Sequence, residues 1–207
     1  MSLAHDERLA LVDTMVRVGP DAPTLCGSWT TRDLAAHLVL RERRPDAAAG
    51  ILVKPLASYA ERVQASLAAR PYVDLLESVR TGPPLWSPMR PFDAQLNLGE
   101  MFVHHEDVRR AGPDWEPREL DSRWQSALWS LAGRTGRMSY RKAPCAVVLV
   151  APDGRRVTVH KAPGVAVEVH GAAAELALHA FGRDAVRVTV EGPAEAVAAV
   201  NALDRGI

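Results

Sequence analysis

The sequence has little lysine, little cysteine and no long apolar run, and each shortage narrows the possible functions. Lysine occurs only at positions 54, 142 and 161, so arginine supplies nearly all of the positive charge. The 25 basic and 25 acidic residues cancel to a formal net charge of zero. Binding of nucleic acid or of an anionic membrane surface needs a basic footprint, so the balanced charge argues against both partners.

Only two cysteines, Cys26 and Cys145, occur among the 207 residues. This number excludes a disulfide scaffold and a four-cysteine zinc site. No run approaches the roughly 18 apolar residues of a membrane span, and the polar first residues lack a signal-peptide core. We therefore expect a cytoplasmic protein. Cys26 is interpreted as a half-buried loop residue without a local histidine partner, and Cys145 as a core residue.

The period of the apolar residues predicts an α+β chain with two domains, over residues 1–140 and 141–207. In the first domain, helices are predicted over residues 4–18, from Thr30 to before Pro45, and over 56–69, 73–80, 92–111 and 121–133. In the second domain, strands are predicted over 145–150, 156–160, 165–170 and 186–190, and helices over 171–181 and 194–203.

The start of the second helix has a strong local signal. Thr30 is a good N-cap, and Asp33 stands three residues later, where the acid of a capping box belongs. On the helix that follows, His37 and Arg41 share one face with the apolar residues Leu34 and Leu38. The sequence therefore predicts that His37 points inward.

The helix predicted over residues 92–111 carries Glu100 and His104 one turn apart. Residues at i and i+4 lie on one helical face, so this carboxylate and imidazole can close on a single cation. His37 is a candidate third ligand, because side chains of neighbouring helices can meet one metal ion. Two nitrogens and one oxygen leave a position open, as in catalytic zinc sites, although the same set also holds non-haem iron.

Other interpretations of these residues remain open. His37 is alternatively a core histidine hydrogen-bonded to a neighbour. His105 replaces His104 if the helical register differs by one residue, although the i+4 rule favours His104. Asp107 is either a hydrogen-bond partner for the second nitrogen of His104 or a solvated acid.

Two short motifs and one longer pattern carry a resemblance to a known family. They read Trp29-Thr30-x-Arg32-Asp33-Leu34-x-x-His37-Leu38, Glu100-x-x-x-His104, and Gly171-x-x-x-Glu175-Leu176-x-Leu178-x-x-Phe181-Gly182-Arg183. The first two resemble the metal-binding domain of mycothiol-dependent maleylpyruvate isomerase, a member of the DinB/YfiT-like superfamily. The third is similar to the sterol-carrier-like C-terminal domain of that family.

The resemblance implies a DinB-like four-helix bundle followed by a small sterol-carrier-like α+β domain. It assigns the metal to His37, Glu100 and His104, with Zn²⁺ as the first choice and Ni²⁺ or Fe²⁺ as others, and it implies mycothiol as co-substrate. The family occurs mainly in actinobacteria, which agrees with the richness in arginine and alanine. Arg41 and Arg183 are candidate catalytic residues: Arg41 would pair with an anionic group, and Arg183 would close over the same pocket. Trp86 is a candidate cofactor-binding residue that lines the pocket.

Three functions are compatible with these residues. The first is an isomerase or S-transferase in which the metal activates a thiol toward a small electrophile. The second is a non-catalytic module that binds a metal and a small ligand, and the third is a hydrogen-bonded cluster without a metal. The sequence is compatible with a monomer or a homodimer.

Overall fold

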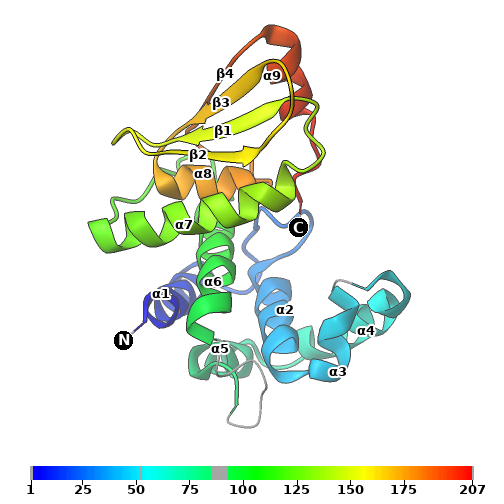
Figure 1. Ribbon diagram of the computed structural model, residues 1–207. Coiled ribbons are helices and arrows are strands. Elements are labelled where there is room, and N and C mark those ends of the chain that lie inside the picture. The colour runs from blue at the N-terminus through cyan, green and yellow to red at the C-terminus, as the bar shows by residue number, and fades with distance from the viewer. Residues whose placement is uncertain (1, 52, 85–92, 207) are drawn as a thin grey trace. The chain divides into compact units, whose positions relative to one another are not determined.

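The computed structural model describes residues 2–51, 53–84 and 93–206. These residues form helices and one four-stranded sheet, so the chain is α+β as expected (Figure 1). The chain divides into two compact units, Met1–Trp115 and Glu116–Ile207. Each unit is described by itself.

The first unit is helical. Its α-helices are α1 (Leu3–Val18), α2 (Thr31–Arg43), α3 (Pro45–Ala48), α4 (Ala57–Ala68), α5 (Tyr72–Thr81) and α6 (Asp93–Arg109), with short 3-10 turns at Ala49–Ile51 and Lys54–Leu56. Helix α1 packs against α5 and α6, while α2 packs against α4 and α5. The core between them includes the fully buried side chains of Leu11, Val12, Met15, Leu34, Leu38, Leu75, Val79 and Met101.

A buried ion pair joins α1 to α2. The guanidinium of Arg8 donates to both carboxylate oxygens of Glu42, at 2.8 and 2.6 Å. Asn97 on α6 donates to the same carboxylate at 3.1 Å. A bidentate pair is directional as well as strong, so this network orients α1, α2 and α6 relative to one another.

The N-terminus of α2 is capped as predicted. Thr30 accepts from the backbone N–H of Asp33 at 3.4 Å, and the Asp33 carboxylate accepts from the backbone N–H of Thr30 at 2.9 Å. This capping box sets the residue at which α2 begins. Its position therefore decides which side chains of α2 face inward.

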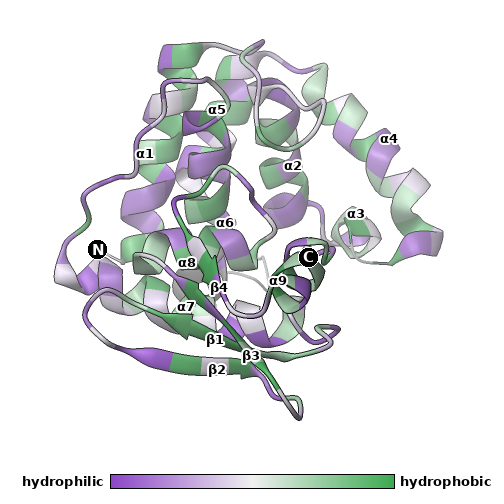
Figure 2. Cartoon of the chain, turned by 90° about the horizontal axis from the view of Figure 1, so that it is seen from above, coloured by the Kyte–Doolittle hydropathy of each residue, from purple (hydrophilic) through white to green (hydrophobic). Residues whose placement is uncertain are grey.

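The second unit contains α7 (Ser122–Ser139), β1 (Ala146–Val150), β2 (Arg156–His160), β3 (Ala166–His170), α8 (Ala173–Ala180), β4 (Thr189–Glu191) and α9 (Ala194–Asn201). The strand order is β2-β1-β3-β4. Strand β1 pairs antiparallel with β2 and parallel with β3, and β3 pairs antiparallel with β4. Strand β1 is hydrophobic throughout, as expected for a central strand (Figure 2).

Helix α7 is longer than predicted, because it continues past Gly133 to Ser139. It lies in the compact unit Glu116–Ile207, and the domain boundary at residue 140 stays a prediction. Two glycines of α7 allow close packing on β2. A Cβ added at Gly136 would lie 2.9 Å from Val159, and one at Gly133 would lie 3.8 Å from Val157.

Strand β4 is shorter than predicted. It pairs with β3 only from Thr189 to Glu191, and Val186 and Val188 lie outside it. The partner strand β3 ends at His170, so the alternating valines before residue 189 have no ladder to join.

Among the helices that the structure describes, none is long and apolar enough to cross a membrane.

Candidate metal centre

The structure brings His37, Glu100 and His104 together in the first unit. His37 is on α2, and the other two are on α6. The Nε2 atoms of His37 and His104 lie 3.5 and 3.2 Å from the same oxygen, Oε1 of Glu100. The two imidazole rings meet edge to face, with their centroids 5.5 Å apart. Three potential ligands from two segments thus face one point.

The spacing of these atoms fits a metal ion. With bonds of about 2.0–2.1 Å, neighbouring ligand atoms of a tetrahedral zinc site lie about 3.3 Å apart. The measured separations of 3.2 and 3.5 Å are close to that value. All three ligand atoms lie within 4.8 Å of one another. The group can therefore hold a cation with only small side-chain movements.

The three side chains are largely buried, but the site remains open to solvent. Their exposed fractions are 10% for His37, 11% for His104 and 23% for Glu100. Trp29 packs against His37 with the ring centroids 5.1 Å apart. Trp29 also lines a hollow of about 390 Å³ together with Asp33, Glu61, Gln64 and Ala65. A small molecule therefore has room beside the ring that covers His37.

The charges around Glu100 keep it ionised. Burial raises the pKa of Glu100, but hydrogen bonds with His104 and His37, and the charges of His104 and Arg41, outweigh this effect. The net pKa lies well below the usual value of a glutamate. Glu100 is therefore available as an anionic ligand at neutral pH.

The surroundings of His104 favour positive charge. Its Nε2 faces Glu100 at 3.2 Å, and its Nδ1 faces Oδ2 of Asp107 at 2.9 Å. Burial lowers the pKa of His104, but its hydrogen bonds with Asp107, Cys26 and Glu100 raise it well above the ordinary value. A metal cation bound to Nε2 would interact with the carboxylate of Glu100 in place of the proton on Nε2.

Asp107 occupies the position expected for an orienting carboxylate. Its side chain is fully buried, so the alternative of a solvated acid is wrong. A hydrogen bond at Nδ1 fixes both the tautomer and the orientation of a metal-binding imidazole. Asp107 can therefore leave Nε2 of His104 free to act as a ligand.

The structure also separates His104 from His105. Nδ1 of His105 lies 2.8 Å from Glu7, and its Nε2 lies 2.9 Å from the hydroxyl of Thr14. Both partners are on α1. The register in which His105 replaces His104 is therefore not the one observed.

The predicted substrate-binding residues have different outcomes. The Nε of Arg41 lies 3.4 Å from Glu100, and its Nη1 donates to Asn97, so it contacts protein groups of the site. Arg183 lies in the second unit and donates to the carbonyl of Phe181 at 2.8 Å. Trp86 lies outside the described residues. A role for these three residues in binding a substrate stays a prediction.

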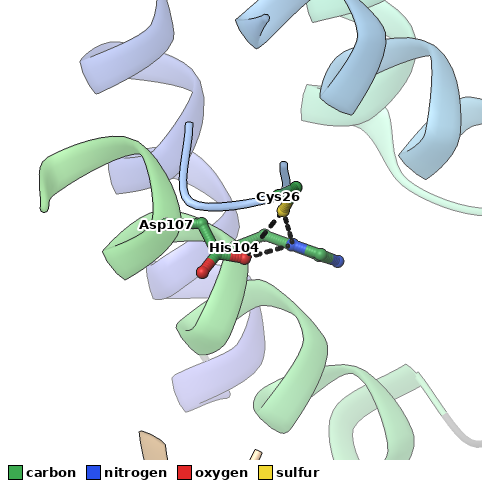
Figure 3. Close-up of side chains that lie close together, drawn as sticks. All are labelled: Cys26, His104 and Asp107. Carbon is green, nitrogen blue, oxygen red and sulfur yellow. Dashed lines mark hydrogen bonds and ion pairs between the residues drawn. The ribbon is translucent and has the colours of Figure 1, made fainter. Parts of the chain in front are cut away.

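Cys26 has a histidine partner that the sequence did not reveal. Its thiol donates to Oδ2 of Asp107 at 3.1 Å, and Sγ lies 3.8 Å from Nδ1 of His104 (Figure 3). The two residues are 78 positions apart in sequence, so no local pattern could connect them. The only available signal was the position of Cys26 just before the helix that carries His37.

The two groups of potential ligands share one residue. Among the residues that the structure describes, His104 belongs both to the group with His37 and Glu100 and to the group with Cys26 and Asp107.

Comparison with protein-family models, curated proteins and solved structures found no match. Geometry and chemistry at His104 are therefore the basis on which a function is assigned.

Proposed function

We propose that the chain binds a divalent metal ion, Zn²⁺ first, through His37, Glu100 and His104. The observation that supports it is the approach of two imidazole Nε2 atoms to one carboxylate oxygen at 3.5 and 3.2 Å. Imidazole and carboxylate ligands suit zinc, nickel and iron, so Ni²⁺ and Fe²⁺ are the competing choices.

The set of three protein ligands suits a reactive site. Structural zinc sites usually have four protein ligands, whereas catalytic ones have three and keep a position for water or substrate. With one carboxylate, a divalent ion keeps a formal charge of +1, which favours an anionic fourth ligand. A cation bound here would supply a Lewis acid that binds a thiol as its thiolate.

The residues around the ligands have distinct roles in this proposal. Arg41 lowers the pKa of Glu100 and so helps to keep the carboxylate ionised. Asp107 orients the ring of His104 through Nδ1. Trp29 packs against His37 and lines a hollow with Asp33, Glu61, Gln64 and Ala65, and we propose that a small electrophile binds in this hollow.

The family resemblance suggests which thiol and which reaction. Residues 29–38 and 100–104 resemble the metal-binding motifs of mycothiol-dependent maleylpyruvate isomerase, a DinB-like four-helix bundle with a sterol-carrier-like second domain. We therefore propose mycothiol as co-substrate and either isomerisation or thiol transfer on a small electrophile. The second candidate is a metal- and thiol-binding module without turnover. The contacts of Arg41 with Glu100 and Asn97 favour this module, because Arg41 is the residue expected to bind an anionic substrate and its guanidinium already has protein partners.

Metal content and thiol binding of the untagged protein test the proposal. Wild-type protein should carry close to one equivalent of metal that depends on His37, and the zinc-loaded form should bind mycothiol in calorimetry. His37→Ala should lose both properties together, whereas the matched variant His5→Ala should keep both.

Full retention of metal by His37→Ala would refute the assignment of the ligands. A panel of small electrophiles with mycothiol then separates the two candidates. Product formation that requires His37 supports the enzyme, and saturable thiol binding without product supports the module.

A further inference from the structure

The imidazole of His104 has potential metal ligands on both of its edges. Its Nε2 faces Glu100, and its Nδ1 faces Cys26 and Asp107 (Figure 3). The atoms Sγ of Cys26, Nδ1 of His104 and Oδ2 of Asp107 lie within 4.8 Å of one another. They form a second group with one sulfur, one nitrogen and one oxygen.

The loop before α2 holds Cys26 in this position. The backbone N–H of Leu25 donates to the carbonyl of Asp107 at 3.0 Å, which ties the loop to α6. Thr24 accepts from the N–H of Cys26 at 3.1 Å, and its hydroxyl donates to the carbonyl of Trp29 at 2.7 Å. Because backbone groups on both sides of Cys26 are bonded, its thiol is directed toward Asp107 before any ligand arrives.

The distances within this second group also match a tetrahedral metal site. With a Zn–S bond of about 2.3 Å and Zn–N and Zn–O bonds of about 2.0–2.1 Å, sulfur lies about 3.5 Å from each of the other ligands. The measured distances from Sγ are 3.1 Å to Oδ2 and 3.8 Å to Nδ1. The separation of 2.9 Å between Nδ1 and Oδ2 is within about 0.5 Å of the tetrahedral value.

We propose that Cys26, Asp107 and Nδ1 of His104 form a second cation site, specific for a thiophilic divalent ion such as Zn²⁺. The sulfur ligand favours zinc-like ions over magnesium and calcium, which prefer oxygen. Binding releases two protons to solvent, the one on the thiol of Cys26 and the one between Nδ1 of His104 and Asp107. The cation takes their place.

When both sites are filled, the proton on Nε2 of His104 would also have left to solvent, and the ring would be shared by the two ions as an imidazolate. Two divalent cations bring four positive charges. Two carboxylates, one thiolate and one imidazolate bring four negative charges, so the pair of sites is neutral overall. This balance matters because an unpaired charge in a buried position is costly.

The second site shares His104 with the proposed function but does not depend on the first site being filled. Its distinctive ligand is sulfur, and Co²⁺ is a probe that reports on sulfur directly. A cobalt–thiolate bond gives a sulfur-to-metal charge-transfer band in the near ultraviolet, which nitrogen and oxygen ligands do not produce.

The experiment is a Co²⁺ titration of the reduced apoprotein, followed by absorption and by equilibrium dialysis. Wild-type protein should bind two equivalents and develop the charge-transfer band. Cys26→Ser should bind one equivalent and lack the band. Cys145→Ser is the matched control, since it removes the other free cysteine, and it should behave like the wild type.

His37→Ala distinguishes this proposal from the proposed function. This variant should lose the ion of the first site and keep the cobalt–thiolate charge-transfer band, because His37 faces the Nε2 side of His104 and the second site uses Nδ1. If Cys26→Ser binds two equivalents, or if wild type develops no band, the second site is refuted. If His37→Ala instead keeps two equivalents, the first site fails and the second stands.

Circular dichroism of each variant establishes that the fold is retained. Cys26→Ala serves as a second substitution in case serine perturbs the loop, and it should give the same stoichiometry as Cys26→Ser.

Discussion

Nδ1 of His105 lies 2.8 Å from Oε1 of Glu7, so this histidine joins α6 to α1 rather than contributing to the metal centre. Thr14, also on α1, lies 2.9 Å from the other ring nitrogen. Both nitrogens of His105 therefore have protein partners, and the ring is buried. Adjacent histidines on one helix thus have separate roles.

We predict that His105→Ala destabilises the protein without removing its metal. Loss of the imidazole takes away one partner of the buried Glu7 and should lower the free energy of unfolding by about 1–3 kcal/mol. Urea unfolding measures the loss, and elemental analysis measures the metal. His104→Ala is the comparison and should lose the metal. Parallel loss of metal in both variants would contradict the assignment.

Asp107→Asn should weaken the first metal site without abolishing it. The carboxylate of Asp107 lies 2.9 Å from Nδ1 of His104 and orients the ring. Removal of such an outer partner typically lowers metal affinity about 10–100-fold. Competition with a chromophoric chelator measures this change. The control is Asp33→Asn, which alters the cap of α2 and should reduce stability more than affinity. An unchanged affinity in Asp107→Asn would show that the ring is oriented by other contacts.

The stability of the second unit should fall as the pH drops below about 6.5. Burial and the nearby charge of Arg205 lower the pKa of His179 to about 3, and the Tyr140 hydroxyl lies 2.5 Å from its Nδ1. A lowered folded-state pKa means that the unfolded chain takes up the proton first. This stability is therefore complete above the unfolded pKa and is lost toward the folded one, by about 1.4 kcal/mol per pH unit at most.

Urea unfolding at pH 7, 6 and 5 tests this dependence. His179→Gln should flatten the change between pH 7 and 5, because glutamine does not titrate. His160→Gln, a substitution on β2, should keep the wild-type slope. An equal slope in all three proteins would assign the acid sensitivity to groups other than His179.

Two glycines of α7 provide a matched pair for the packing on β2. A Cβ at Gly136 would lie 2.9 Å from Val159, so Gly136→Ala should destabilise by about 1–3 kcal/mol through overpacking. A Cβ at Gly133 would lie 3.8 Å from Val157. Gly133→Ala should therefore be neutral or stabilise by up to about 1 kcal/mol, because alanine favours helix.

Thermal unfolding of the two variants measures the contrast. Val159→Ala in the Gly136→Ala background should recover part of the lost stability, since it removes the Cγ1 atom that would lie 2.9 Å from the new methyl group. If Gly136→Ala is as stable as Gly133→Ala, the close approach of α7 to β2 is not a constraint.

Local signals explain what could be predicted from the sequence. The cap at Thr30 depends on residues within one turn of the chain. Glu100 and His104 are also one turn apart, so these two ligands share a helical face by geometry alone. The approach of His37 depends on packing of α2 and α6, and it could be proposed only because an apolar face carried a histidine.

Features set by distant contacts were missed. Cys26 reaches Asp107 because a loop crosses α6, and no spacing rule describes such a path. The helix predicted over residues 121–133 continues to Ser139, and its glycines lie where α7 meets β2. Val186 and Val188 alternate with polar residues as in a strand, but they lie before the segment of β4 that pairs with β3.

The capping box of α2 has a consequence for how tolerant the chain is to changes in length. His37 follows Thr30 by seven residues, nearly two full helical turns. Because the cap fixes where the helix begins, this number of residues sets the direction in which the imidazole points. One inserted residue between them would swing the imidazole by about 100° around the helix axis and away from Glu100. An insertion between α3 and α4 would leave that count intact. Sequences that keep this centre should therefore vary in the second interval and be constant in the first.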